Sequence, residues 1–323
     1  MQPPEPAAYN GSAAASGEVD VGTGSLICHR CGFRAREAGV ERCPEDGLHL
    51  VGEEDHRLSP GDPYLGATLG GRYPILGLAA GDGRPELHYR SRQPLSGREV
   101  VLHVFPPAAE RTEDHQPLLQ AAAAITGLNH PGVVRLLDCG TAQDGTTILV
   151  WEQVHSSSLA ELFARGGFTC RELVQLAVMV LDALAEAHGK GIPHGDLRPE
   201  SILLPGGGEP GADVPWIKIR SFGLSKLLRL AGGGQPAVAP AGATAAPEPD
   251  CAADLRALSA LLRQGLSGQV ADGAVGFPAG LLEILERALA PAPETGFASA
   301  REMGAALEDL SLGAEADRPL PPV

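Results

Sequence analysis

Three cysteines and an aspartate near the start of the chain have the residue types and spacing of a metal site. Cys28 and Cys31 form a C-x2-C pair, and Cys43 follows after eleven residues in the sequence CPED. Two thiols on one turn and a third on a second turn suit tetrahedral zinc, which binds sulfur and nitrogen and also accepts carboxylate oxygen. Asp46 stands where a second C-x2-C pair would place a cysteine. We therefore predict a zinc site formed by Cys28, Cys31, Cys43 and Asp46.

The sequence leaves the fourth ligand of this site open. His29 and His49 are close enough along the chain to compete with Asp46, because imidazole nitrogen is a common zinc ligand. A reduced knuckle without metal is the alternative interpretation. A segment as short as 27–52 has no core of its own, so we expect the metal to stabilise its fold rather than to act in a reaction.

The secondary structure predicted after these residues passes from strands in the first part of the chain to helices in the second. Strand-like segments with alternating apolar residues come first, among them ELHYRSRQ, REVVLHVF and TTILVWEQV, with one helical segment near residues 116–128. A 3.6-residue period dominates afterwards, as in RELVQLAVMVLDALAEAHGKG and DLRALSALLRQGL. A sheet followed by helices predicts an α+β fold with two lobes over residues 69–310.

Composition divides the rest of the chain. Residues 1–26 are rich in Ala, Gly, Ser and Pro and are expected to be disordered. Residues 27–52 form the zinc-ribbon-like segment. We expect a linker over 53–68, EEDHRLSPGDPYLGAT, and a polar, proline-rich tail over 311–323.

The overall charge and the cysteine usage limit the classes of partner. The net charge of −15 argues against a general nucleic-acid or anionic-membrane binder, because phosphates would repel it. No apolar run approaches the length that spans a bilayer, and the first residues lack the pattern of a secretory signal. The remaining cysteines are scattered, which is typical of a reducing compartment. We expect a cytoplasmic protein.

Residues 69–310 are similar, in the order and spacing of several motifs, to the bacterial Hanks-type serine/threonine protein kinase domain. HGDLRPESILL resembles the catalytic loop HRDLKPENILL, and IKIRSFGLSK resembles the segment with the metal-binding DFG motif. NHPGVVRLLD, GATAAPE and DLRALSALL resemble further segments of that family. The CxxCG…CPxDG pattern resembles zinc ribbons that precede many bacterial kinase domains. The resemblance implies a protein-kinase-like fold with a small β-rich lobe and a larger helical lobe.

The residues that would hold the phosphates of ATP depart from the family pattern. Gly81 and Gly83 keep two glycines of the phosphate-covering loop, but Glu86 replaces the third. His103 stands in place of the phosphate-binding lysine of the VAIK motif, and an imidazole is mostly neutral at pH 7. The resemblance thus implies a degenerate nucleotide site at Gly81, Gly83 and His103, and it argues against ATP and magnesium as cofactors.

No other cation is well placed to replace that lysine. The lysines of the chain are Lys190, Lys218 and Lys226, and none of them falls in the small lobe. Arg84 and Arg90 are the arginines that could reach the phosphates. The lysine's usual partner, a glutamate of the small-lobe helix, falls at Ala121. The resemblance therefore implies that the ion pair of an active kinase is missing.

The catalytic loop keeps one group that could take part in phosphoryl transfer. By resemblance, Asp196 is the remnant of the aspartate that accepts the proton of the substrate hydroxyl, and Arg198 keeps the positive charge of the family's lysine. Ser201 replaces the asparagine that holds a second magnesium ion. Ser221 replaces the aspartate of DFG. Magnesium prefers anionic oxygen ligands, so both serines weaken the metal site.

The positions that would surround adenine are also changed, whereas the scaffold positions are kept. By resemblance, Val101 replaces the small alanine of VAIK, His88 replaces the valine of the glycine-rich loop, and Trp151 leads into the hinge. We expect these side chains to fill space that a purine would use. By resemblance, the family's buried hydrophobic column is kept at Ile125, Leu136, His194 and Phe222. Its anchor in the large lobe is kept at Asp254.

The sequence therefore predicts a catalytically impaired kinase-like protein, a pseudokinase, that acts as a protein-binding or allosteric signalling module. By resemblance, its partner is a protein, such as an active kinase. One alternative is a weak or unconventional serine/threonine kinase that still binds ATP. A second alternative is a zinc-ribbon module that recognises a protein and uses the larger domain as support.

Overall fold

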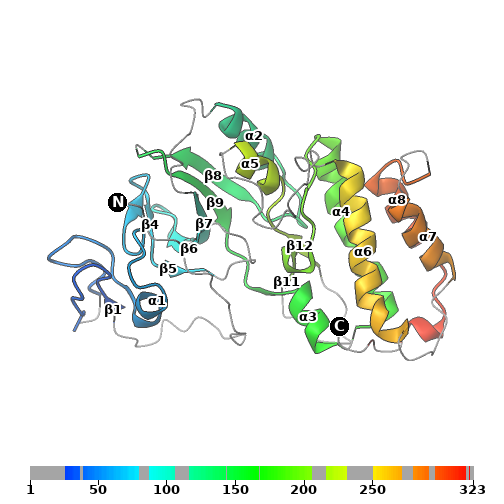
Figure 1. Cartoon of the computed structure of the whole chain (residues 1–323), viewed down its shortest axis with the longest axis horizontal. Helices are drawn as coiled ribbons and strands as arrows, with labels where there is room; N and C mark the ends of the chain where they lie inside the picture. Colours follow the sequence, from blue (N-terminus) through cyan, green and yellow to red (C-terminus); the bar gives the residue numbers. More distant parts are fainter. Residues whose placement is uncertain are drawn as a thin grey trace, which may run out of the picture.

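The computed structural model places a small lobe and a large lobe side by side (Figure 1). It describes residues 26–36, 39–79, 87–105, 116–142, 144–166, 168–205, 216–230, 250–270, 279–290, 295–317 and 320. Several expectations concern residues outside these ranges: the disorder before residue 26, the loop residues Gly81, Gly83, Arg84 and Glu86, and the GATAAPE segment at 242–248.

The small lobe is built on an antiparallel sheet of five strands in the order β5-β6-β7-β9-β8. The strands are β5 (Gly77–Leu78), β6 (Leu87–Arg92), β7 (Glu99–Phe105), β8 (Leu136–Thr141) and β9 (Thr147–Glu152). Helix α2 (Gln116–Thr126) packs on β8. The strand-like segments and the helix predicted from the sequence are confirmed here as β6, β7, β9 and α2.

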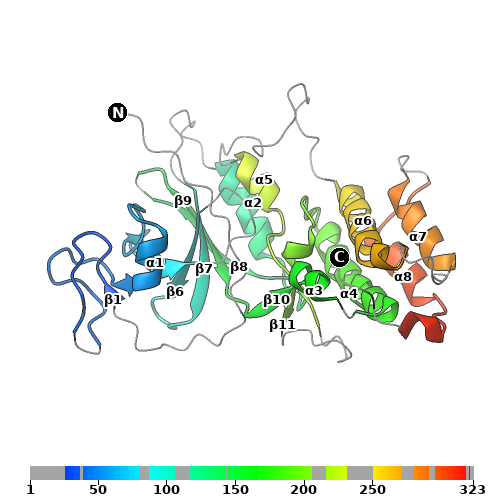
Figure 2. The ribbon, with the colours of Figure 1, turned by 60° about the horizontal axis from the view of Figure 1, so that its bottom comes forward.

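The large lobe is mainly helical, and its long helices lie side by side in both ribbon views (Figures 1 and 2). The helices are α3 (Leu159–Arg165), α4 (Cys170–Gly189), α6 (Cys251–Val270), α7 (Ala279–Leu289) and α8 (Ala300–Glu308). Helix α5 (Leu224–Leu230) follows later in the chain than α4 but packs on α2 of the small lobe. Helix α4 begins with a capping box, in which Thr169 and Glu172 each bond the other's backbone N–H. Such a box satisfies two free donors at the first turn.

A small sheet and a short helical turn lie where the lobes meet. Strand β11 (Ile202–Pro205) pairs with β10 (Ser156–Ser158) on one side and with β12 (Lys218–Ile219) on the other. The 3-10 turn η1 (Pro199–Ser201) leads directly into β11. Because Ile202 pairs with Ile219 in these antiparallel strands, the stretches HGDLRPES and RSFG lie together at the same end of this sheet.

The small-lobe sheet contributes to two hydrophobic cores, one on each face. Tyr89, Leu102 and Val104 are fully buried on one face, which we call the outer face. Trp151 and Leu149 belong to the core that continues through α2 into the large lobe. The outer face is covered by side chains from earlier in the chain, namely Ile27, Val51, Leu65, Leu69, Tyr73 and Ile75.

The cysteine segment and the segment after it form this cover. Their elements are β1 (Leu26–Ile27), β2 (Val51–Gly52), α1 (Glu53–Leu58), β3 (Thr68–Leu69) and β4 (Tyr73–Pro74). Residues 53–68, which the sequence suggested as a linker, thus contain a helix that is docked on the small lobe. The signal was present, because Glu53, Glu54 and Asp55 are acidic residues in a first helical turn, where they favour helix formation.

The tail expected over 311–323 is in contact with the large lobe where it is described. It contains the 3-10 helix η2 (Ala314–Asp317), in which Ala316 is buried. Arg171 of α4 donates from Nε to Asp317 Oδ1 at 2.5 Å, and the backbone N–H of Leu320 donates to the carbonyl of Phe168. The polar, proline-rich composition of the tail did not predict these contacts, because the partners are far apart in the chain. Arg171 and Asp317, for example, are separated by 146 residues.

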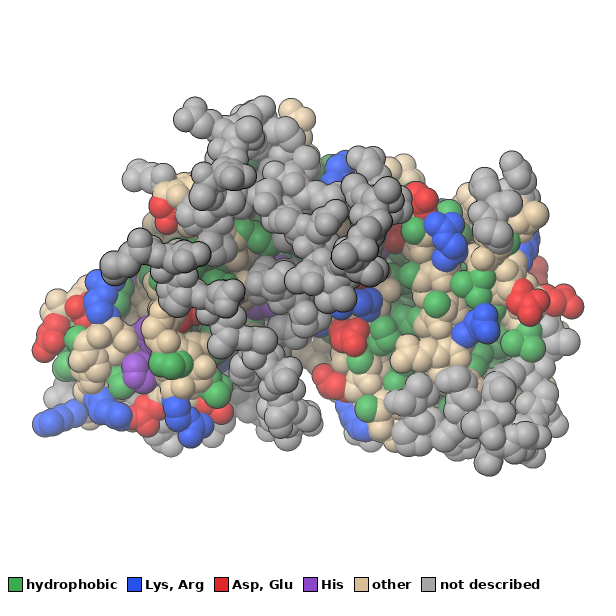
Figure 3. All heavy atoms as spheres, in the orientation of Figure 1, with side chains coloured by type: hydrophobic (Ala, Val, Ile, Leu, Met, Phe, Trp, Pro, Cys, Tyr) green, Lys and Arg blue, Asp and Glu red, His purple; other side chains and the backbone are tan. Residues whose placement is uncertain are grey.

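The helices and one face of the surface can be compared with what a membrane span or a nucleic-acid binder requires. Within the described ranges, none of the helices combines the length and apolar character that a bilayer crossing requires. Charges of both signs are interspersed over the coloured part of the face in Figure 3. That face of the described residues offers no continuous basic surface of the kind that binds a phosphate backbone.

Candidate functional site

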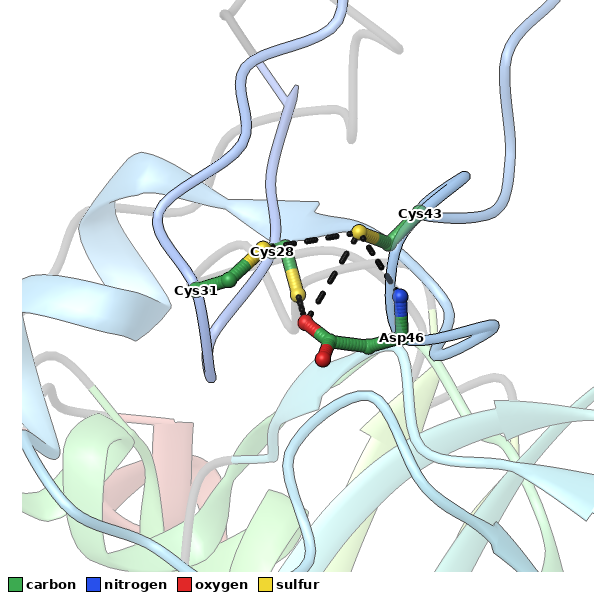
Figure 4. A group of neighbouring side chains, drawn as sticks. All are labelled: Cys28, Cys31, Cys43 and Asp46. Carbon is green, nitrogen blue, oxygen red and sulfur yellow. Dashed lines mark hydrogen bonds between the residues drawn. The ribbon is translucent and has the colours of Figure 1, made fainter.

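The four residues predicted to bind metal lie together at the far end of the small lobe (Figure 4). Their ligand atoms all lie within 4.8 Å of one another. Cys28 Sγ lies 3.2 Å from Asp46 Oδ2, and Cys31 Sγ lies 3.5 Å from Cys43 Sγ. Tetrahedral zinc with Zn–S bonds of about 2.3 Å would separate two thiolates by about 3.8 Å. The donor set and its spacing therefore fit a zinc ion.

The metal ligands are held by two loops with the same backbone pattern. Cys28 N–H donates to Phe33 O at 2.7 Å and Cys28 O accepts from Gly32 N at 3.0 Å. In the second loop, Cys43 N–H donates to Leu48 O at 2.8 Å and Cys43 O accepts from Gly47 N at 2.9 Å. The glycines have φ values of 78° and 70°, in the left-handed region that favours glycine.

This repeat indicates which residue completes the site. In the first loop Cys31 precedes the glycine, and in the second loop Asp46 precedes it. The rival His29 points its Nδ1 at His56 Nδ1, 3.0 Å away, and His49 is not a member of the described cluster. Hydrogen bonds from the Cys31 and Cys28 thiols hold the pKa of the Asp46 carboxyl below its usual range. Asp46 is thus the carboxylate available as fourth ligand.

The catalytic-loop residues Asp196 and Arg198 lie beside each other between the lobes. Arg198 Nε is 3.4 Å from Asp196 Oδ2, and both side chains are more than one-third exposed. The backbone N–H of Asp196 donates to His194 Nδ1 at 3.3 Å, which fixes the start of the loop. An exposed carboxylate in this position could accept a proton from a bound hydroxyl.

Ser201 serves the backbone of its own loop. Its Oγ donates to Arg198 O at 2.7 Å and accepts from Arg198 N at 3.0 Å. The side chain is buried, with 2% of the residue exposed. A hydroxyl engaged twice by the main chain has little capacity left for a metal ion. This arrangement agrees with the expectation that Ser201 is a weak magnesium ligand.

Ser221 is buried and its backbone is in an unusual conformation. Its φ of 68° makes it the one residue other than glycine with a positive φ among the described residues. Glycine, asparagine or aspartate would adopt the backbone conformation of Ser221 more easily than serine does. As a possible metal ligand, the Ser221 side chain provides only a neutral hydroxyl.

The scaffold residues around Ser221 form a packed column. The rings of His194 and Phe222 meet edge to face, with centroids 4.9 Å apart. Both residues, together with Ile125 and Leu136, are at most 4% exposed. Asp254 is also buried, and its carboxylate accepts from the backbone N–H groups of His194 and Gly195 at 2.7 and 2.8 Å. The scaffold roles expected by resemblance match these contacts.

The rings of His88, His103 and Trp151 lie next to one another on the small-lobe sheet. His88 and His103 are partners on adjacent strands, and their ring centroids are 4.2 Å apart. The His103 ring lies 5.8 Å from the Trp151 ring, and Trp151 is the strand partner of Val101. All three ring residues are at most 8% exposed. Of the three side chains predicted to fill the purine space, Val101 is thus the strand partner of Trp151, and His88 is connected to Trp151 through the ring of His103.

Arg90, one of the two arginines considered as a substitute for the missing lysine, has other partners, and so does Lys218 of the large lobe. Arg90 donates to Leu78 O at 2.9 Å and to Asp55 Oδ2 at 2.7 Å, on the outer side of the sheet. Lys218 forms a largely buried ion pair with Glu152 at the end of β9. Sequence reasoning missed both ion pairs, and no local pattern signals them because their partners are far away in the chain. Neither cation is available to neutralise a triphosphate.

The sequence comparisons connect this chain with kinases. Residues 80–240 match the family described as "Protein kinase domain". Serine/threonine-protein kinase pkn3 of Myxococcus xanthus is 32% identical over 234 residues, which cover 67% of this chain and 42% of that protein. Serine/threonine-protein kinase PrkC of Bacillus subtilis is 28% identical over 166 residues, covering 51% of this chain and 24% of that protein. The chain thus spans less than half the length of these curated relatives.

The solved structures agree on the fold. The crystal structure of the Mycobacterium tuberculosis PknI kinase domain superposes with a TM-score of 0.58 at 23% sequence identity. The match covers 76% of this chain and 99% of that chain. The two-lobed part of this chain is therefore a domain with the protein kinase fold, related to the bacterial serine/threonine protein kinases.

Proposed function

We propose that this chain is a pseudokinase, which has the kinase fold but has lost efficient phosphoryl transfer, and that it acts by binding a protein. The observation that carries the proposal is the ring group of His88, His103 and Trp151, which we call the ring plug. By resemblance, its positions border the adenine and the phosphates of ATP. A nucleotide needs an open apolar slot with a few polar groups, and in this proposal the rings occupy that slot.

The polar groups of the cleft support the same proposal. Phosphoryl transfer needs a neutralised triphosphate, a firmly held magnesium ion and an oriented acceptor hydroxyl. Asp196 could orient a hydroxyl. Ser201 is engaged by the backbone, Ser221 is neutral, and the imidazole of His103 replaces a permanent charge. The residues that remain can bind the acceptor, but they lack the means to hold the donor.

A titration of the purified full chain with ATP and magnesium tests this function. Ligands that bind the native state raise its melting temperature, so we expect no rise up to millimolar ATP. Radiolabelled phosphate transfer to the chain itself or to a generic acceptor should equal the background. Transfer that disappears in Asp196→Ala would overturn the proposal, since it would make Asp196 a working catalytic residue.

A weak serine/threonine kinase that still binds ATP is the second candidate, and the comparisons favour it. The relatives reported above are named serine/threonine kinases, and on their own they support an active kinase better than loss of activity. The exposed Asp196 beside Arg198 is the structural observation in its favour. A melting-temperature rise that needs both ATP and magnesium would support this candidate.

We further propose that Cys28, Cys31, Cys43 and Asp46 hold a structural zinc ion. Closed four-ligand sites of this kind stabilise short segments that lack a large core. The support is the ligand spacing and the repeated loop. Purified protein should contain about one zinc per chain by elemental analysis. Loss of zinc from a Cys28→Ser variant, with the large lobe still folded, is the expected outcome, and unchanged zinc content would refute the ligand assignment.

The class of partner is inferred from the proposed function. We propose a protein partner, such as an active kinase in the cytoplasm, and neither nucleic acid nor a membrane. A third candidate function is recognition by the zinc ribbon alone. The shared core of Ile27, Val51 and the small-lobe sheet favours a structural role for the ribbon instead. Affinity purification with intact chain and with Cys28→Ser would separate the two, since only ribbon recognition requires the metal ligands directly.

A further inference from the structure

A buried aspartate joins the cysteine segment to the small-lobe sheet. Asp55 of α1 is 8% exposed, and its Oδ1 accepts from the backbone N–H of Leu78 on β5 at 2.9 Å. Its Oδ2 accepts from Arg90 Nη2 on β6 at 2.7 Å, while Arg90 Nε donates to Leu78 O at 2.9 Å. One carboxylate thus holds both strands, and we call Asp55 with Arg90 and Leu78 the clamp.

The backbone leaves room for this clamp at one glycine. A Cβ atom on Gly77 would lie 2.5 Å from Asp55 Oδ2 and 2.3 Å from Arg90 Nη2. Real Cβ atoms do not approach other atoms this closely, so the clamp requires glycine at this position. The φ of Gly77 is not in the left-handed region. The need for glycine therefore comes from the approach of the clamp and not from a turn.

Asp62 adds a second attachment to the same sheet. Its Oδ2 accepts from the hydroxyl of Tyr89 on β6 at 2.8 Å. Its Oδ1 accepts from the backbone N–H groups of Tyr64 and Leu65 at 2.8 and 3.1 Å. The whole segment from α1 to β3 is therefore fixed to β5 and β6 by hydrogen bonds to carboxylates, which are stronger than those between neutral groups.

The clamp is close in the chain to the proposed zinc site. Ile27 pairs with Val51, and Cys28 follows Ile27 directly. Gly52 then leads into α1, so three residues separate Val51 from Asp55. Figure 2 shows α1 beside β6, between the cysteine segment and the sheet. A change in the order of the cysteine loops would reach α1, and with it Asp55, through the β1–β2 pair and through the contact of His29 with His56.

We propose that metal binding at the cysteine segment fixes β5 and β6 through the Asp55 clamp. These strands flank residues 79–86, the stretch that resembles a phosphate-covering loop. Metal loss would release β1 and β2, and the buried carboxylate of Asp55 would leave the Leu78 N–H and Arg90 without their acceptor. The metal thereby controls the order of the strands beside the cleft. This inference rests on the proposed zinc site and is independent of whether the cleft binds ATP.

Amide hydrogen exchange of the full chain, with and without a zinc chelator, tests the coupling. Opening of a protected amide reports local stability. We expect chelation to speed exchange of the Leu78 amide roughly 10- to 100-fold, the effect of losing a hydrogen bond to a charged group. Amides in the middle of α6 should exchange at unchanged rates. Zinc per chain is measured in the same samples.

Two variants in α1 make the test specific. Asp55→Asn weakens the clamp and leaves the ligands intact, so zinc content should stay the same. In this variant the Leu78 amide should exchange fast whether or not zinc is present. Glu54→Gln is the matched control, because Glu54 is the exposed neighbour in the same helical turn. It should keep the wild-type dependence of Leu78 exchange on zinc.

The outcomes separate the coupling from the zinc site. If zinc is bound and its removal leaves Leu78 exchange unchanged, the coupling is refuted and the zinc site stands. If chelation changes Leu78 exchange equally in wild type and Asp55→Asn, the coupling does not run through Asp55 and is refuted in this form. Absence of zinc from the purified chain would refute both the site and the coupling.

Discussion

Replacing Trp151 by alanine tests whether the ring plug is what closes the purine space. The indole is 3% exposed and lies in the core shared by the two lobes. Removing a buried aromatic ring costs about 3–5 kcal/mol, against a total stability of about 5–15 kcal/mol. The variant should therefore fold, with a melting temperature lower by about 5–15 °C. Trp151→Met, which leaves a smaller hole, covers the case in which alanine prevents folding.

The chain offers a matched control for this experiment. Trp216 is the second of its two tryptophans and is 45% exposed. Trp216→Ala should change the free energy of unfolding by about 0.5 kcal/mol or less, as is typical for exposed positions. The two single variants also assign the fluorescence, because the emission that remains in Trp216→Ala comes from the ring plug alone.

The hole should accept small planar molecules. Apolar cavities bind ligands that match them, and a ligand at a hundred times its Kd stabilises the native state by about 2.7 kcal/mol. Indole, adenine and ATP should each raise the melting temperature of Trp151→Ala and leave wild type and Trp216→Ala unchanged. Rescue by indole without any effect of adenine or ATP would show that the hole is not in the purine site. An ATP effect in wild type would refute the plug itself.

Four further outcomes follow from the described contacts. Asp46→Cys should tighten zinc binding in a chelator competition and Asp46→Ala should weaken it at least about tenfold; equal affinities would exclude Asp46 as a ligand. Gly223→Ala should destabilise the fold by about 1–3 kcal/mol, because the φ of Gly223 is 66° and a Cβ would lie 2.7 Å from Ile125 Cδ1. In denaturant unfolding, the double variant with Ile125→Val should recover part of this loss. Asp254→Asn should cost about 1–3 kcal/mol in the same assay, and an unchanged midpoint would contradict its anchoring role. Burial and the hydrogen bond to the Asp138 carboxylate raise the pKa of Tyr73 from 10.0 to about 12. The stabilisation that neutral Tyr73 contributes is complete below pH 10 and should be lost as the pH rises from 10 to 12. Tyr73→Phe should remove that part of the pH dependence of the unfolding free energy.

The parts of the fold that local pattern controls could be predicted from the sequence. Strands β6, β7 and β9 were recognised from their runs of apolar residues, whose side chains are divided between the two covered faces of the sheet. The two cysteine loops repeat a short motif, so residue type and spacing were enough to predict that Cys28, Cys31, Cys43 and Asp46 lie together. Motif order along the chain also marked Asp254 as the anchor of the large lobe, and in the structure its carboxylate accepts two hydrogen bonds from the backbone at His194 and Gly195.

The parts that depend on docking could not be predicted. Asp55 and Arg90 are 35 residues apart, and Lys218 and Glu152 are 66 apart. Such pairs form only after packing has brought their elements together, and neither periodicity nor composition encodes them. The same holds for the ring plug: the sequence placed its rings at the border of one site, but only the register of β6 against β7 sets His88 opposite His103.

The covered outer face of the small-lobe sheet has a consequence for where the folding unit starts. The family match begins at residue 80, yet Tyr89 and Leu102 are buried by side chains that come before it, such as Val51 and Leu65. A truncated chain that starts at residue 80 would place a stripe of aromatic and aliphatic side chains in water, which promotes aggregation. Expression of residues 26–323 should give soluble monomer where 80–323 precipitates. The autonomous unit therefore begins at the cysteine loops, and the kinase fold of this protein carries its own N-terminal cover as part of its core.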